Sequence, residues 1–288
     1  MREAEGCRVS IESLTVGYGG TPLVREINVQ LRPGEIMTII GPNGAGKTTM
    51  LKSLVRQLTP LGGAVYLDGK SLEQLRDRDV ARLASIVLTQ RPKTEMMTCR
   101  EVAATGRYPY TGRFGRLSPH DKKIVEEAMA LVCVSELADR DFMKISDGQR
   151  QRVMLARAIS QEPKILILDE PTSFLDIRYK LEFLSVLQQL SRKKGLTVIM
   201  SLHELDLAQR ISDKIACIRG GKMDRLGKPE EIFASGYIRE LFQVTEGSME
   251  ERTGTLEMPG PRGVPRVFVL GGGGTGIPVY RRLQREGV

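Results

Sequence analysis

Eight consecutive residues have the types and the spacing to bind phosphate. They match the pattern G-x-x-x-x-G-K-[ST] and are Gly41, Pro42, Asn43, Gly44, Ala45, Gly46, Lys47 and Thr48. In such a loop the backbone N–H groups curl around phosphate oxygens, the lysine reaches the β- and γ-phosphates, and the hydroxyl joins the Mg²⁺ shell. The sequence therefore predicts a site for a nucleoside triphosphate and Mg²⁺.

Two adjacent carboxylates could complete the chemistry of such a site. Asp169 and Glu170 follow the apolar run 165–168, about 120 residues after the phosphate loop. Asp169 can hold the Mg²⁺ shell, and Glu170 can polarise the water that attacks the γ-phosphate in line. Two consecutive acids at the end of a buried strand would serve a purely structural purpose poorly. The pair therefore favours hydrolysis over simple binding.

Alternating strands and helices must position these groups. The phosphate loop lies between a strand-like run, 35–40, and a helix-like segment, 48–58. The runs 164–169 and 196–201 predict two further buried strands, separated by a helix that stops at Gly195. Between residues 91 and 144 the pattern is helical, with a helix start at Ser118 and Pro119. This order predicts an α/β fold with a mainly parallel sheet.

Composition excludes several classes of protein. The formal net charge is +8, and 41% of the residues are hydrophobic, which is typical of a folded globular chain. No run approaches the roughly 20 apolar residues of a membrane span, and the first residues lack a signal-peptide core, so we expect a chain that is neither inserted nor secreted. Four scattered cysteines and two histidines cannot form a zinc site or a disulfide framework, which fits a reducing cytosol. His120 has no motif around it and is expected at the surface.

These motifs resemble the ATPase subunit of ABC transporters over about residues 8–243. The segment Ile145, Ser146, Asp147, Gly148, Gln149 is similar to the family signature, most often L-S-G-G-Q. The resemblance implies a P-loop NTPase core with an N-terminal antiparallel β subdomain, a helical subdomain at about 91–144, and ATP and Mg²⁺ as cofactors. It also implies that Ser146, Gly148 and Gln149 contact the γ-phosphate held by the opposite subunit of a dimer. Ile145 and Asp147 depart from the common form, and the Asp147 side chain is expected to point away from phosphate.

Further positions match the family one at a time. Tyr18 resembles the aromatic residue that stacks on adenine, and Thr49 completes the nucleotide-binding set. Gln90 is similar to the glutamine that joins the Mg²⁺ shell, together with Thr48 and Asp169, and links the ATP site to the membrane partner. Asp176 resembles the acid of the loop that crosses the dimer interface. His203 matches the histidine that touches the γ-phosphate and orients Glu170. The resemblance thus implies four catalytic residues: Lys47, Gln90, Glu170 and His203.

One segment narrows the resemblance to a class of importer. Residues 102–121, read with T-S-F-L-D-I and L-H-E-L-D-L-A, are similar to subunits that drive import of iron–siderophore complexes, haem and vitamin B12. This implies a homodimer on a separate transmembrane permease at the cytoplasmic face of the membrane, served indirectly by an extracytoplasmic binding protein. An exporter ATPase remains an alternative. A non-transport ATPase acting on nucleic acid or ribosomes is disfavoured, because no coiled coil separates Lys47 from Ser146 and the chain carries one cassette; we expect no nucleic acid partner.

Residues 244–288 differ in character from the rest. From residue 252 onward the chain has six arginines against two glutamates. Residues 266–270 predict a strand, and Gly271, Gly273 and Gly276 precede a helix-like stretch, 277–286, which resembles the start of a dinucleotide-binding unit. The acid expected about 20 residues later is missing. We therefore expect a Gly- and Arg-rich tail, similar to a truncated Rossmann-like unit, that binds no ligand.

Overall fold

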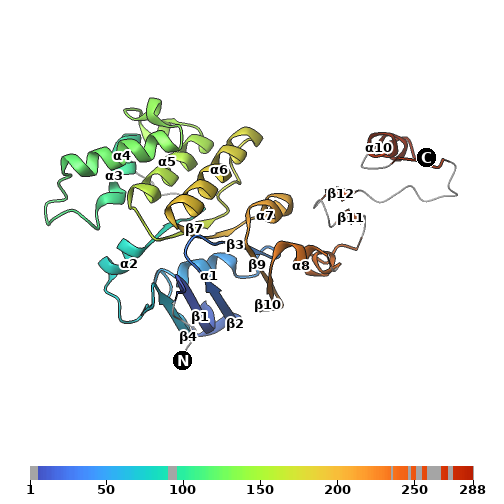
Figure 1. The fold of residues 1–288 in the computed structure, drawn as a ribbon, viewed down its shortest axis with the longest axis horizontal. Helices are drawn as coiled ribbons and strands as arrows, with labels where there is room; N and C mark the ends of the chain where they lie inside the picture. The colour runs from blue at the N-terminus through green and yellow to red at the C-terminus, as the bar shows by residue number, and fades with distance from the viewer. Residues whose placement is uncertain are drawn as a thin grey trace.

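The computed structural model describes residues 6–89, 96–234, 236–245, 248–250, 255–257, 267–271 and 275–287. Its main feature is a ten-stranded sheet flanked by helices (Figure 1). The strands are β1 (Val9–Tyr18), β2 (Thr21–Leu31), β3 (Ile36–Ile40), β4 (Gly62–Leu67), β5 (Lys70–Ser71), β6 (Ala84–Val87), β7 (Ile165–Asp169), β8 (Thr197–Ser201), β9 (Lys214–Arg219) and β10 (Lys222–Gly227). Their order in the sheet is β5-β4-β1-β2-β10-β9-β3-β8-β7-β6.

The sheet has a parallel part and an antiparallel part. Strands β9, β3, β8, β7 and β6 run parallel to one another, whereas β1, β2, β4 and β5 pair antiparallel. Strand β10 joins the two parts, since it pairs antiparallel with β9 and parallel with β2. The expected fold class, a mainly parallel core with an N-terminal antiparallel unit, is confirmed.

The other regular elements of the fold are helices. They are α1 (Lys47–Ser53), α2 (Asp77–Leu83), α3 (Cys99–Ala104), α4 (Pro119–Leu131), α5 (Asp147–Ser160), α6 (Ile177–Lys194), α7 (Leu205–Ile211), α8 (Pro229–Phe233), α9 (Tyr237–Leu241) and α10 (Ile277–Arg285). Helices α3, α4 and α5 pack on one another and form a helical body beside the sheet (Figure 1). None of the helices in the described part of the chain has the length and apolar character to span a membrane.

The core consists of two apolar layers with the sheet between them. Strand β3 shows this best, because Ile36 and Ile40 belong to one cluster while Met37 and Ile39 belong to the other. Side chains of a strand alternate between the two faces, so a strand that is covered on both sides is apolar throughout. Burial on both faces fixes the carboxyl end of β3, where the phosphate loop begins.

Local signals predicted some helix ends correctly and missed one. At the start of α4 the Ser118 hydroxyl accepts from the backbone N–H of Asp121, whose carboxylate accepts in return from Ser118, a capping box. Gly195 ends α6 with a left-handed φ of 65°. Helix α1 is shorter than the predicted 48–58, since it ends at Ser53. Arg56 has a φ of 59°, a conformation that cannot continue a helix.

The tail differs from its expectation in two places. Residues 267–270 form no strand, so the strand predicted at 266–270 is wrong over the part that is described. A strand needs a paired neighbour for its backbone groups, and none was predicted. An antiparallel pairing that was not expected occurs between β11 (Ser248–Glu250) and β12 (Thr255–Glu257). The predicted helix is confirmed as α10, and Gly273 lies outside the described residues.

Candidate functional site

The phosphate loop connects the buried end of β3 to α1 and uses its glycines where no other residue fits. Gly41, Gly44 and Gly46 have φ angles of 153°, 76° and 100°, which L side chains rarely adopt. A Cβ on Gly41 would lie 2.5 Å from the carbonyl oxygen of Ile218 in β9, and one on Gly46 would overlap Val24. The loop is therefore held close to β9 and β2 at positions where only glycine fits.

Lys47 lies across this loop. Its Nζ donates to the carbonyl oxygens of Gly41, at 2.8 Å, and Pro42, at 3.0 Å. Lys47 is only 6% exposed. Burial lowers its pKa, while the nearby carboxylates of Glu170 and Asp169 act in the opposite direction. A buried ammonium group beside curled backbone N–H groups suits a phosphate chain.

Asp169 ends β7 and is surrounded by hydroxyl groups. Thr48 Oγ1 lies 2.8 and 3.0 Å from its two carboxylate oxygens, Ser201 Oγ donates to Oδ1 at 2.9 Å, and Thr89 Oγ1 donates to Oδ2 at 3.2 Å. Asp169 is 3% exposed. The donor set is a carboxylate and a hydroxyl, hard oxygen ligands that fit Mg²⁺ held mainly by substrate phosphates and water. No group of three or more His, Cys, Asp or Glu side chains around a metal position occurs among the described residues.

Glu170 is held in an unusual backbone conformation beside His203. Its φ is 48°, which is uncommon for a residue with a side chain and typical of functional sites when the surroundings enforce it. Its backbone N–H donates to Ser201 Oγ at 2.9 Å. One carboxylate oxygen lies 2.6 Å from His203 Nε2, and Ser173 Oγ donates to the other at 3.4 Å. The carboxylate is thus supported on both sides while it stays partly exposed to solvent.

Two residues of this arrangement were missed from the sequence. Ser201 ties Asp169 to the backbone of Glu170, and Thr89 bonds both the carboxylate and the carbonyl group of Asp169. Ser201 is directly opposite Asp169 in the parallel pairing of β8 with β7. The signal in the sequence that could have identified Ser201 is its place as a hydroxyl residue at the end of the apolar run 196–201.

Two other expected residues lie at the margin of this arrangement. Tyr18, at the end of β1, is 54% exposed. Its phenol oxygen accepts from Thr49 Oγ1 in α1 at 3.4 Å, so its ring lies next to the helix that follows the phosphate loop. Gln90 lies outside the described residues, although Thr89 before it is described.

The expected signature residues form a separate part of the surface. Ser146 is the N-cap of α5: its hydroxyl accepts from the backbone N–H of Gln149, and the Gln149 side chain accepts from the backbone N–H of Ser146. Gly148 lies close to a neighbouring loop, since a Cβ there would meet the carbonyl oxygen of Phe174 at 3.0 Å. The Asp147 carboxylate accepts from Arg150 at 2.9 Å, so it is turned toward the helix surface.

These residues line a hollow that they share with Asp176. The hollow has a volume of about 360 Å³, and Arg152 and Tyr179 also line it. Asp176 begins α6, where its carboxylate accepts from the backbone N–H of Tyr179 at 3.0 Å. No residue of the phosphate loop is among those that line this hollow. Within the described chain, the expected site residues therefore form two groups, one around Lys47 and Glu170 and one around Ser146.

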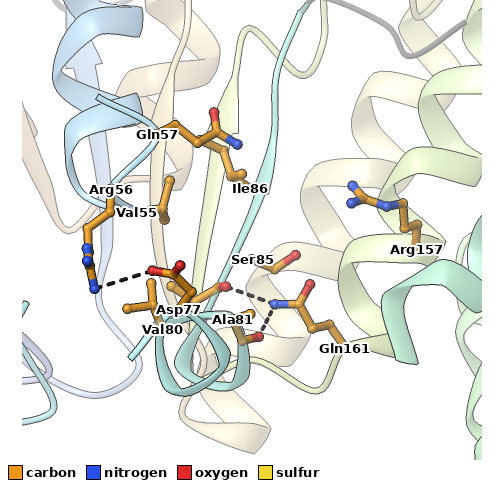
Figure 2. Close-up of a pocket in the computed structure, with 11 residues that line it drawn as sticks. Val55, Arg56, Gln57, Asp77, Val80, Ala81, Ser85, Ile86, Arg157 and Gln161 are labelled. Atoms are coloured by element: carbon orange, nitrogen blue, oxygen red, sulfur yellow. Dashed lines mark hydrogen bonds and ion pairs between the residues drawn. The ribbon is translucent and has the colours of Figure 1, made fainter. Parts of the chain in front are cut away.

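A further hollow, of about 290 Å³, lies between the sheet and the helical body (Figure 2). The segment that follows α1 lines it with Val55, Arg56 and Gln57. Residues of α2 and β6 form further walls, and Arg157 and Gln161 at the end of α5 complete the lining. Burial lowers the pKa of the Arg157 guanidinium.

Two hydrogen bonds join the walls of this hollow. Gln161 donates to the carbonyl oxygens of Ala81 and Ala84, which connects the end of α5 to α2 and β6.

Comparison with known proteins shows the family of the chain. The family model described as ABC transporter matches residues 24–173. An ABC transporter ATP-binding protein of Methanocaldococcus jannaschii is 44% identical over 96% of this chain and 95% of its own length. The iron(3+)-hydroxamate import ATP-binding protein of Bacillus subtilis is 36% identical over 82% of this chain and 88% of its own. The cobalamin import ATP-binding protein of Halobacterium salinarum is 33% identical over 97% of this chain and 71% of its own length.

Solved structures give the same result. A dimeric ATP-binding cassette bound to ADP and phosphate, in a post-hydrolysis state, matches with a TM-score of 0.69 at 26% identity and covers 76% of this chain and 98% of that chain. A chain of a metal-chelate type ABC transporter has the same fold, with a TM-score of 0.71 at 24% identity over 91% of this chain and 98% of that chain. This chain belongs to the family of ATP-hydrolysing, ATP-binding subunits of ABC transporters.

Proposed function

We propose that the chain hydrolyses MgATP as one of two paired subunits and thereby drives import of iron–siderophore, haem or cobalamin-type chelates through a separate permease. The observation that carries the hydrolytic part is the connected group Thr48, Asp169, Ser201, Glu170 and His203, which lies next to the phosphate loop. Each link is a hydrogen bond or close polar contact between residues on different elements. Such an arrangement holds reacting groups in fixed positions.

In this proposal the side chains divide the work by position. Lys47 and the loop N–H groups hold the β- and γ-phosphates, and Thr48 and Asp169 provide the ligands for Mg²⁺, which when bound neutralises phosphate charge. Glu170 accepts a proton from the attacking water as the water adds to the γ-phosphorus. His203, 2.6 Å from Glu170, orients that carboxylate and contacts the γ-phosphate. The nucleotide stacks on Tyr18, and Gln90 completes the Mg²⁺ shell.

Pairing of two chains would complete each site. Ser146, Gly148 and Gln149 lie at the start of α5 and line the hollow of about 360 Å³, which Asp176 also lines. A helix N-terminus of this kind favours an anion. We infer that this group contacts the γ-phosphate bound by the opposite chain, so that two sites form in a head-to-tail homodimer.

The hollow of Figure 2 supports contact with a permease at the cytoplasmic face of the membrane. It lies where α5 of the helical body meets the sheet, so an inserted helix would touch both parts at once. Beside it, Arg107 fixes the loop after α3, because it donates to Asp121 at 2.9 Å and to the carbonyl oxygen of Ser160 at 2.7 Å, and stacks on Tyr110. The loop is therefore held in one shape, as a docking surface requires.

This docking surface can be tested with a pair of variants. Gln57→Trp would narrow the hollow, whereas Gln74→Trp introduces the same side chain at an exposed position that does not line it. We expect Gln57→Trp to reduce permease-bound chain by about tenfold and Gln74→Trp to leave it unchanged, measured by co-purification from membranes. Equal retention of both variants would reject this site.

The substrate class rests on relatives. Two of the relatives named above are import proteins for iron(3+)-hydroxamate and for cobalamin, and both substrates are metal chelates. The decisive experiment reconstitutes the chain with its permease and binding protein in vesicles and measures which chelate stimulates ATP hydrolysis. A chelate of this class should raise turnover several-fold. Stimulation by a substrate delivered from the cytoplasmic side, with no response to any chelate, would show an exporter instead.

A further inference from the structure

Helix α10 divides into an apolar half and a basic half. Projected at about 100° per residue, its apolar side chains share one half of the circumference. They are Ile277, Val279, Tyr280 and Leu283. The other half carries Arg281, Arg282 and Arg285. No charged residue falls within the apolar half, which Gln284 alone interrupts.

The described residues cover this apolar half only in part. Helix α10 buries none of its residues, and Tyr280 remains 40% exposed. The preceding segment, 267–271, folds back on the start of the helix, since a Cβ on Gly276 would lie 3.2 Å from Val269 Cγ1. Phe268 and Leu270 in that segment are each 85% exposed. The helix and this segment therefore gather apolar surface in one small unit.

The net charge of the tail indicates which kind of partner would bind α10 and the segment 267–271. Residues 252–288 carry six arginines against two glutamates, a net charge of +4, and the rest of the chain supplies the other half of the total +8. The ATPase body and a second copy of the tail therefore both carry the same sign as α10. An anionic partner is complementary. Nucleic acid would offer phosphates but no apolar phase for Tyr280 and Leu283, whereas an anionic lipid surface offers both.

We propose that α10, together with Phe268 and Leu270, binds the surface of a membrane that contains anionic lipid. The helix lies in the plane of the interface, with its apolar half among the acyl chains. The arginines extend their apolar stems outward to lipid phosphates. Pro278 in the first turn favours the helix start. This contact adds to any contact with a permease and does not depend on import of a particular substrate.

The experiment uses the full chain and lipid vesicles without a permease. Flotation with vesicles of about 30% phosphatidylglycerol in phosphatidylcholine should recover the chain, while pure phosphatidylcholine should recover about tenfold less, since each basic residue near an anionic surface adds attraction. Salt at about 0.5 M should weaken the binding, because it screens charge. Equal recovery with both kinds of vesicle would overturn the proposal.

Variants assign the binding to the helix. Arg281→Glu with Arg285→Glu, and separately Leu283→Asp, should each lower vesicle binding by about tenfold. The control Lys122→Glu with Lys123→Glu makes the same change of net charge on the exposed side of α4 and should bind like the unchanged chain. ATP hydrolysis should stay the same in every variant. The proposal would be overturned if both tail variants still bound vesicles. It would also be overturned if the chain bound no vesicles and sedimentation without lipid showed a dimer that required the tail.

Discussion

Glu170 has a backbone conformation and hydrogen bonds that predict the effect of a minimal substitution. Glu170→Gln retains the shape of the side chain but removes its ability to accept a proton from water. We expect ATP binding to persist and turnover to fall by about 10²-fold or more, with accumulation of an ATP-stabilised dimer. Single-turnover kinetics and size-exclusion chromatography with ATP would measure both effects.

A contrasting variant separates binding from hydrolysis. Lys47→Ala removes the buried ammonium group that lies across the phosphate loop. This variant should bind ATP weakly and form no ATP-dependent dimer. Turnover in Glu170→Gln equal to that of the unchanged chain would show that the base has been misassigned.

Ser201 provides the second prediction at this scale. Its hydroxyl accepts from the backbone N–H of Glu170 and donates to Asp169. Ser201→Ala therefore leaves the partly buried N–H of Glu170 without this acceptor and the Asp169 carboxylate with one bond fewer. Loss of such a partner costs about 1–3 kcal/mol, and the orientation of both acids is loosened. Turnover should fall about tenfold or more with ATP affinity nearly unchanged.

The control for Ser201 is another buried serine. Ser191 donates to the carbonyl oxygen of Gly34 at 2.6 Å, and it has no bond to Asp169 or Glu170. Ser191→Ala should lower the melting temperature without a selective loss of turnover. A Ser201→Ala chain with normal turnover would remove the serine from the proposed mechanism.

Among the elements, those with local signals were predictable. The capping box at Ser118 and the glycine after α6 lie within a few residues of the ends they mark. The early end of α1 has no such local signal in the sequence. The residue with the left-handed conformation there is Arg56, whose guanidinium donates to the carbonyl oxygen of Leu75, a contact between residues distant in the sequence. The phosphate loop was predictable for the same reason, as a continuous motif. The bonds of Ser201 to Asp169 and Glu170 were not, since they depend on the register of β8 against β7.

The cap of α4 gives a prediction for this scale. Ser118→Ala removes the hydroxyl that bonds both the backbone N–H and the carboxylate of Asp121. We expect the free energy of unfolding to fall by about 1 kcal/mol, measured by urea denaturation. Ser118→Asp, which can cap the same helix, should recover most of the loss. Equal stability of Ser118→Ala and the unchanged chain would mean that Arg107, which also bonds Asp121, holds this turn alone.

At the scale of the whole molecule, the separation of the two groups of site residues is the reason for proposing that one chain hydrolyses ATP only when it is paired with a second chain. The group around Lys47 supplies the phosphate loop and the acids, while the group around Ser146 borders a different hollow. The sequence carried both motifs, but their separation depends on where α5 begins relative to β3. A dimer of the same cassette fold is known in the post-hydrolysis state.

The tail follows every proposed site residue in the sequence, which gives the final prediction. Deletion of residues 252–288 should leave ATP hydrolysis and ATP-driven dimerisation nearly intact, because every proposed nucleotide contact lies between Tyr18 and His203. NAD should not raise the melting temperature of the full chain, because residues 267–270 do not form the strand that a dinucleotide-binding glycine motif follows. A ligand that does not bind the folded state cannot stabilise it. Thermal scans of both chains with and without NAD provide the measurement. A rise in the full chain that is lost on deletion would establish a second nucleotide site at Gly271 and Gly276.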